Sequence, residues 1–209
     1  MTTTVEWTSA LPGWTLAWWR LETTGEAAAA LEARRTGLAA ELARTTTIEA
    51  LAGDPVVASL RRLFRAAGSD PSRYRPSSEA LLRRLMKGES LPSIHPLVDL
   101  NNQLSMELRV PACVMRDGSF AFPVELRAGR AGEALDAMRG PLDLSGKPLL
   151  ADAAGPFGTP ITDSHRVKVL PETTAGWLVA YLPADRLTAD AASAALDAIL
   201  AAAPVARRA

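Results

Sequence analysis

Hydrophobic residues recur at three- and four-residue intervals in several stretches of the first half of the chain, which is the spacing of amphipathic helices. Asp54 and Pro55 suit the N-cap and the first position of one such helix, and Gly68 marks its predicted end. A second helix is predicted to end at Gly88. The apolar positions of this second helix are Leu81, Leu82 and Leu85.

A third predicted helix begins after Pro96 and has a polar residue within its apolar face. The apolar residues of this face are Leu97, Leu100, Leu104 and Leu108. Asn101 projects into the same sector, and Ser105 lies at its edge. Burying an amide costs on the order of 1–3 kcal/mol unless its hydrogen bonds are satisfied. Asn101 therefore needs either a structural partner or a ligand.

The two ends of the chain also give clear patterns. Residues 14–22 follow a Pro-Gly turn and are rich in tryptophan, which predicts a strand, and residues 26–44 have the composition of a helix. Thr46 and Glu49 have the spacing of a capping box that would open a short second helix. Near the C-terminus, "GWLVAYLP" reads as a buried strand. The final predicted helix ends before Pro204 and has a face formed by Ala192, Leu196, Ile199 and Ala203.

The middle of the chain changes to short strand-like pieces after Pro111. "ACVM" and "FAFPVELR", separated by the turn "RDGS", predict one hairpin, and "LDLSGKPLLAD" predicts another with its turn at Ser145-Gly146. Residues 155–163 are rich in glycine and proline and resemble a shaped binding loop. Helices early, strands in the middle and a helix at the end favour an α+β fold, with a mixed central sheet covered by helices.

Composition limits the class of protein. A chain of 209 residues suits one domain, and its single cysteine, Cys113, excludes an intrachain disulfide. The first residues lack the basic and apolar regions of a signal peptide, and no apolar run approaches the roughly 20 residues that span a bilayer. We therefore expect a cytoplasmic protein without membrane insertion.

The charge is balanced overall but not locally. The chain has 23 basic and 23 acidic residues. Residues 61–87, however, contain eight basic residues against two acidic ones. This segment is either the solvated face of two helices or a docking surface for phosphates. Within it, Arg75 precedes Pro76 in extended chain and is expected to pair with Glu79 or Asp99.

The motifs of several enzyme classes are missing from the sequence. Two histidines and one cysteine give no metal-ligand spacing, and the chain has no glycine cradle for a nucleotide cofactor and no GxSxG elbow. We expect neither a metal nor a cofactor. Cys113 is either a nucleophile or, more commonly, a small buried hydrophobe. In "TDSHRVK", consecutive residues of extended chain cannot all enter one pocket, so Asp163 either caps a loop or contacts a ligand, and His165 is expected to face solvent.

An ordered set of motifs resembles a known family. The segments are "RPSSEALLRRL", "LVDLNN", "LRAGRAGE" and "LLADAAGPFG". In this order they resemble the B3/B4 domain of the bacterial phenylalanyl-tRNA synthetase beta subunit, and more closely its free-standing relatives. The resemblance covers about residues 57–183. We therefore expect a single B3/B4-like domain over residues 1–209, with a strand-helix extension at 1–53 and a C-terminal helix at 186–203.

The resemblance implies a fold, a site and a partner. In the synthetase this domain hydrolyses tyrosine wrongly attached to the phenylalanine tRNA, and its fold is a three-layer α+β unit. By resemblance the segment containing Asn101 borders the pocket and the Gly/Pro loop forms the other wall, while no catalytic residue is assigned. The residues expected to bind the amino-acid moiety are Asn101, Asn102, Ser105, Phe157, Gly158, Asp163 and Ser164. Those expected to bind tRNA phosphates are Arg61, Arg65, Arg83 and Arg84.

Three functions remain open from the sequence. The first is hydrolysis of an aminoacyl ester on mischarged tRNA, for which orientation and a few hydrogen bonds suffice because the ester is already reactive. The second is a non-catalytic RNA-binding module that keeps the fold. The third is a pocket protein for a free amino acid or another small metabolite.

Overall fold

The structure is a computed structural model that describes residues 5–25, 29–138 and 140–209. Its α-helices are α1 (Ala29–Thr45), α2 (Pro55–Ala67), α3 (Ser77–Met86), α4 (Pro96–Leu108) and α5 (Ala189–Ala202). Two short 3-10 helices are η1 (Ala50–Gly53) and η2 (His165–Val167). The first residues of the helix predicted over 26–44 lie outside the described residues.

The described strands form two four-stranded sheets and a separate pair. One sheet is antiparallel throughout and has the order β10 (Ala206–Arg208), β2 (Trp14–Thr23), β9 (Ala175–Pro183) and β3 (Ala112–Arg116). The other is mixed and has the order β1 (Trp7–Ser9), β4 (Val124–Ala128), β7 (Pro148–Asp152) and β8 (Gly155–Gly158). It is mixed because β1 runs parallel to β4. The pair is β5 (Ala134–Ala137) with β6 (Gly140–Asp143).

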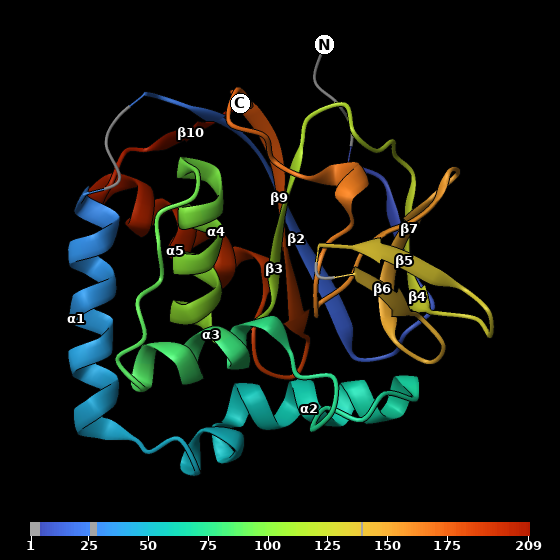
Figure 1. Cartoon of the computed structure of the whole chain (residues 1–209), viewed down its shortest axis with the longest axis horizontal. Coiled ribbons are helices and arrows are strands. Elements are labelled where there is room, and N and C mark those ends of the chain that lie inside the picture. The colour runs from blue at the N-terminus through green and yellow to red at the C-terminus, as the bar shows by residue number, and fades with distance from the viewer. Residues whose placement is uncertain (1–4, 26–28, 139) are drawn as a thin grey trace.

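The elements are arranged in three layers. Helices α1, α4 and α5 lie on one side of the β2–β9–β3 sheet, and the second sheet lies on its other side (Figure 1). The main core is continuous across these layers, since α4 contributes Leu100, β9 contributes Val179 and β7 contributes Leu150 to one cluster. The expected α+β class is thus confirmed.

Several helix boundaries follow directly from local sequence. Asp54 Oδ1 accepts hydrogen bonds from the N–H groups of Val56 and Val57, and Gly68 ends α2 with a φ of 102°, which favours glycine. Helix α4 is capped by His95, whose Nδ1 accepts a hydrogen bond from Leu97 N. Pro96 occupies the first helical position, where an N–H group would have no partner within the helix. The predicted capping box at Thr46 is wrong. Thr47 Oγ1 accepts from Ala50 N instead, and only the 3-10 helix η1 follows.

Both predicted hairpins are wrong because the pattern identified strands without identifying their partners. Strand β3 pairs with β9, whereas β4 pairs with β1 and β7, so the chain crosses from one sheet to the other between them. Phe120 and Phe122 of this crossing contact the rings of Trp18 and Trp177 from the first sheet. Likewise β6 pairs with β5 and β7 with β4. The segment predicted as a loop over 155–163 begins as strand β8, paired with β7.

Candidate functional site

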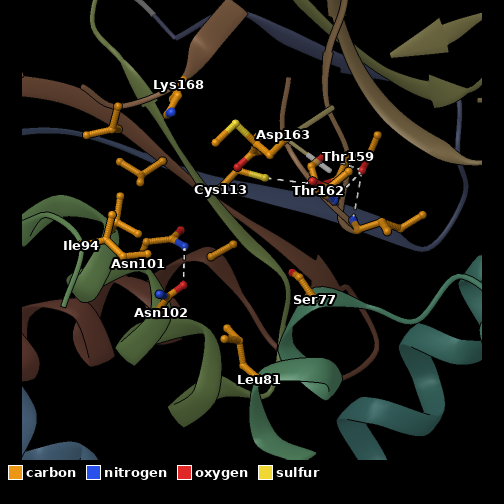
Figure 2. Close-up of a pocket in the computed structure, with 16 residues that line it drawn as sticks. Ser77, Leu81, Ile94, Asn101, Asn102, Cys113, Thr159, Thr162, Asp163 and Lys168 are labelled. Atoms are coloured by element: carbon orange, nitrogen blue, oxygen red, sulfur yellow. Dashed lines mark hydrogen bonds between the residues drawn. The ribbon is translucent and has the colours of Figure 1, made fainter. Parts of the chain in front are cut away.

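A pocket of about 250 Å³ lies where the edges of the two sheets meet. Strand β3 is the outer strand of one sheet, and β8 is the outer strand of the other. One wall comes from β3 and the other from the chain after β8, while α3 and α4 close the space between them (Figure 2). The residues that line it include Asn101, Asn102, Cys113, Asp163, Ile94, Met138 and Lys168. Much of the remaining lining is apolar and comes from Leu81, Val98, Val114, Ile161 and Val169.

Asn101 presents a free acceptor to this pocket. Its helix is held in place by Leu97, Leu100 and Leu104, all fully buried, so the amide has a fixed direction. Asn101 is only 7% exposed, and its Nδ2 donates to Asn102 Oδ1 over 3.4 Å. Its Oδ1 is buried without a hydrogen-bond partner among the described residues. An unpaired buried acceptor of this kind is the feature that a donor on a ligand would satisfy.

Asp163 presents a second free acceptor from the opposite wall (Figure 2). Its backbone pairs with Gly158, and its carbonyl accepts from Met138 N over 3.3 Å, so the loop is fixed. The carboxyl oxygen Oδ1 is buried and has no hydrogen-bond partner in the described chain. Burial raises the pKa of Asp163 to about 7, with the Cys113 thiol opposing the shift. At neutral pH the carboxyl is therefore protonated to a much larger extent than that of an exposed aspartate.

Cys113 contributes a thiol to the pocket wall. Its Sγ donates to Thr159 O over 3.4 Å and lies 3.7 Å from the hydroxyl of Tyr181, so it links β3 to the opposite wall and to β9. Burial raises the pKa of Cys113 well above its usual value, and the Asp163 carboxylate raises it further. The thiolate is the nucleophilic form of cysteine. The environment thus favours the interpretation of Cys113 as a buried hydrophobe over that of a nucleophile.

The pocket gathers three of the seven residues predicted to bind the amino-acid moiety, namely Asn101, Asn102 and Asp163. The other four do not line it. Ser105 Oγ donates to Val110 O over 2.7 Å, and Ser164 Oγ donates to Phe157 O over 2.8 Å. The Phe157 ring stacks on Phe120. Gly158 is occupied by pairing with Asp163 and with β7.

Sequence reasoning missed several lining residues. Ser77 and Leu81 come from α3, Thr159 and Thr162 from the loop after β8, and Lys168 from the end of η2. Thr159 Oγ1 donates to Thr162 O and accepts from the N–H groups of residues 161 and 162, so it shapes this loop. A threonine directly after Gly158 was the available signal, since threonine side chains commonly bond their own backbone in turns.

The other groups of "TDSHRVK" do not form a triad. Ser164 is buried against Phe157 O, and His165 is exposed, as predicted. Arg166 binds the Asp152 carboxylate and donates to Ser119 O over 3.2 Å. Within the described residues, no three His, Cys, Asp or Glu side chains gather in the way that a metal ion needs.

The predicted phosphate-binding arginines are mostly engaged in ion pairs. Glu79 is fully buried in α3 and lies 2.9 Å from Arg61, 3.4 Å from Arg75 and 3.1 Å from Arg83. The expected pairing of Arg75 with Glu79 is thus confirmed. These interactions give Arg61 and Arg83 a structural role that the sequence did not indicate.

The remaining two arginines are more accessible to an external partner. Arg84 pairs with Glu89 at the surface over 3.2 Å. Arg65 is exposed, and no ion pair of its side chain occurs within the described residues. Arg65 is therefore the most accessible cation of the four that were predicted to bind phosphates.

Comparison with known families gives a clear result. The family model of the B3/4 domain matches residues 59–197, about two thirds of the chain. The chain therefore belongs to the B3/4 domain family, and the resemblance drawn from the sequence is confirmed.

Among solved structures, the chain is similar to an N-terminal fragment of the phenylalanyl-tRNA synthetase beta-subunit from Pyrococcus horikoshii, with a TM-score of 0.49 and 11% sequence identity. The similarity covers 98% of this chain and 50% of that fragment, so the chain spans half the length of this relative. No curated protein matches the chain. No helix among the described residues is long and apolar enough to cross a membrane.

Proposed function

We propose that this B3/4 domain binds the amino-acid part of a mischarged aminoacyl-tRNA and hydrolyses its ester. Membership of the family supports this function, since the family includes the editing domain of a tRNA synthetase beta subunit. The pocket supports it independently, because it combines apolar walls with a small number of inward polar groups. The apolar walls suit the side chain of an amino acid, and the inward polar groups suit its amino group.

The observation that carries the proposal is the pair of unsatisfied acceptors, Asn101 Oδ1 and Asp163 Oδ1. Leaving a buried polar group without a partner costs about 1–3 kcal/mol. A ligand that donates hydrogen bonds recovers this free energy on binding. The ammonium group of an aminoacyl ester, or a hydroxyl on its side chain, is such a donor, and Asp163 adds negative charge when it is ionised.

The chemistry then rests on position rather than on a covalent enzyme intermediate. A water oxygen attacks the ester carbonyl carbon, and the bond from that carbon to the ribose oxygen of the tRNA breaks. The ribose oxygen takes a proton from the attacking water, so the products are the free amino acid and the tRNA with its hydroxyl restored. An aminoacyl ester is reactive enough for orientation and hydrogen bonding to provide the acceleration. Asn101 and Asp163 hold the amino acid, and the protonated Cys113 remains a wall residue.

A non-catalytic pocket for a free amino acid is the second candidate. It needs only the apolar pocket and the two unsatisfied acceptors, Asn101 Oδ1 and Asp163 Oδ1, and no group that activates water. A third candidate, an RNA-binding module without turnover, draws on the exposed Arg65. Turnover separates the first candidate from the other two.

Deacylation of tRNA charged with tyrosine, and with other amino acids in parallel, tests the proposal. We expect acceleration over buffer, reduced by at least tenfold in Asn101→Leu and Asp163→Asn. Asp136→Asn is the matched control, because Asp136 is exposed on β5 and does not line the pocket. No acceleration for any charged tRNA would exclude hydrolysis. A thermal shift with free amino acids that also disappears in Asn101→Leu would then establish the second candidate.

A further inference from the structure

The rim of the pocket carries exposed apolar side chains. Among the described residues, the exposed large hydrophobic side chains are Val5, Ile94 and Met138. Two of these three, Ile94 at 69% exposure and Met138 at 41%, line the same pocket. Scattered apolar residues need no explanation, but apolar residues that gather at the mouth of a pocket indicate a contact surface.

The backbone at both rim residues is anchored. Ile94 N donates to Asp99 Oδ1 over 3.1 Å, and Asp99 is itself buried at the start of α4. Met138 N donates to Asp163 O over 3.3 Å. The two side chains therefore extend from fixed positions, and one of these positions is tied to the ligand-facing Asp163.

A positive charge completes the rim. Lys168 is one of the residues that line the pocket (Figure 2). It is an exposed residue. Its backbone is held by a hydrogen bond from Lys168 N to His165 O at the end of η2. No ion pair or hydrogen bond of its ammonium group occurs within the described residues. Its ammonium group is therefore available to an anionic group at the mouth of the pocket.

The size of the pocket limits how much of an aminoacylated nucleotide can enter it. At about 250 Å³ it falls below the roughly 300–1,000 Å³ of pockets for drug-sized ligands. A pocket of this size has room for an amino-acid moiety but not for an attached nucleoside as well, so the nucleoside would lie outside. At that position it meets Ile94, Met138 and Lys168.

Resting on the proposed function, we infer that this rim binds the terminal nucleotide of the aminoacyl-tRNA. Ile94 and Met138 contact the faces of the base, and Lys168 pairs with a phosphate of the nucleotide. The site would thus select an amino acid linked to a nucleotide over the same amino acid when free.

Binding of three non-hydrolysable probes to the full chain tests the inference by calorimetry. The probes are 3′-tyrosylamino-3′-deoxyadenosine 5′-phosphate, the same nucleoside without phosphate, and tyrosinamide; an alanyl series is measured in parallel. We expect the nucleotide probe to bind at least tenfold more tightly than the amide. Ile94→Ser with Met138→Ser should remove most of this advantage, and Lys168→Gln should remove the preference for the phosphate.

Two control variants accompany these measurements. Val5→Ser changes the third exposed large hydrophobic residue of the described part of the chain. Lys87→Gln changes an exposed lysine that does not line the pocket. Both should keep the full advantage, and melting curves verify that every variant is folded.

The two proposals fail in different ways. Equal affinity for the nucleotide probe and the amide, or an advantage that the rim variants leave intact, would overturn the inference and leave the proposed function standing. Failure of every probe in both series to bind would contradict both proposals together.

Discussion

Asp163 illustrates how burial of one carboxyl links the site to stability. In the unfolded chain its pKa is that of ordinary aspartate, about 3.9, whereas in the folded protein it is raised to about 7. Between these values the folded state holds a proton that the unfolded state has released. The stabilisation of the folded state by this bound proton is fully present below about pH 4 and is lost as the pH rises to about 7.

Replacement by asparagine removes this pH dependence. Asp163→Asn should leave stability nearly unchanged at pH 4 and raise it above pH 7 relative to the parent protein, by at most about 4 kcal/mol at 1.36 kcal/mol for each pKa unit. Melting temperatures of both proteins from pH 4 to 8 measure the difference, with Asp136→Asn as the control. A difference that does not change with pH would contradict the raised pKa.

Of the two unsatisfied acceptors in the pocket, the sequence identified Asn101 clearly and only suggested Asp163. Asn101 was recognisable because helical geometry places it among leucines, and that geometry depends on neighbouring residues alone. The burial of Asp163 depends on Cys113 from β3 and on the loop that Thr159 shapes. These contacts join segments about fifty residues apart, and no local pattern reports them.

At the scale of elements, Glu79 joins α2, the segment before α3, and α3 itself. Its carboxylate is fully buried and is surrounded by Arg61, Arg75 and Arg83. Helix α3 also supplies Ser77 and Leu81 to the pocket. The three ion pairs therefore position one side of the pocket, although none of the four residues lines it.

Glu79→Gln should be strongly destabilising, because it leaves several cations without their common partner. Breaking a buried ion pair from one side typically costs about 3–5 kcal/mol. Glu89→Gln is the matched control, since Glu89 pairs with Arg84 at the surface, where a single pair contributes about 0–1 kcal/mol. Urea unfolding of both variants gives the comparison. A decrease in stability for Glu79→Gln no larger than for the control would remove the structural role assigned to this cluster.

The helices and strands themselves were predicted more accurately than the pairing between strands. The apolar stripes of α2 and α4 and the strand β9 agree with the structure because each depends on its own residue period. Both hairpins failed because β3 joins β9, and β7 joins β4. Aromatic contacts such as Phe122 with Trp177 fix this crossing between sheets, and they are invisible to alternation along one strand.

At the scale of the whole molecule, the arrangement of charge bears on RNA binding. The chain is neutral overall, and three of the arginines in its basic segment bind Glu79. Electrostatic attraction of tRNA would then depend on the more accessible cations, among them Arg65 and Arg84. This attraction is weaker than a count of basic residues suggests.

The double variant Arg65→Gln, Arg84→Gln should bind tRNA more weakly and with a lower salt dependence. Removing one arginine–phosphate interaction reduces the slope of log affinity against log salt by about 0.7–0.9. Filter binding or anisotropy over a salt series measures this slope. Arg44→Gln, at an exposed position in the last turn of α1, should match the parent protein. Equal slopes for all three proteins would exclude phosphate binding by these two arginines.

The position of the pocket between two sheet edges has a consequence for protein engineering. The cavity depends on how the sheets are held together, and the Phe120–Phe157 stack, with ring centroids 4.9 Å apart, is one contact that holds β8 to the crossing segment. Affinity can therefore be altered from a distance by residues that never meet the ligand. A library of variants screened for tighter ligand binding would return substitutions at such aromatic contacts as well as at the residues that line the cavity.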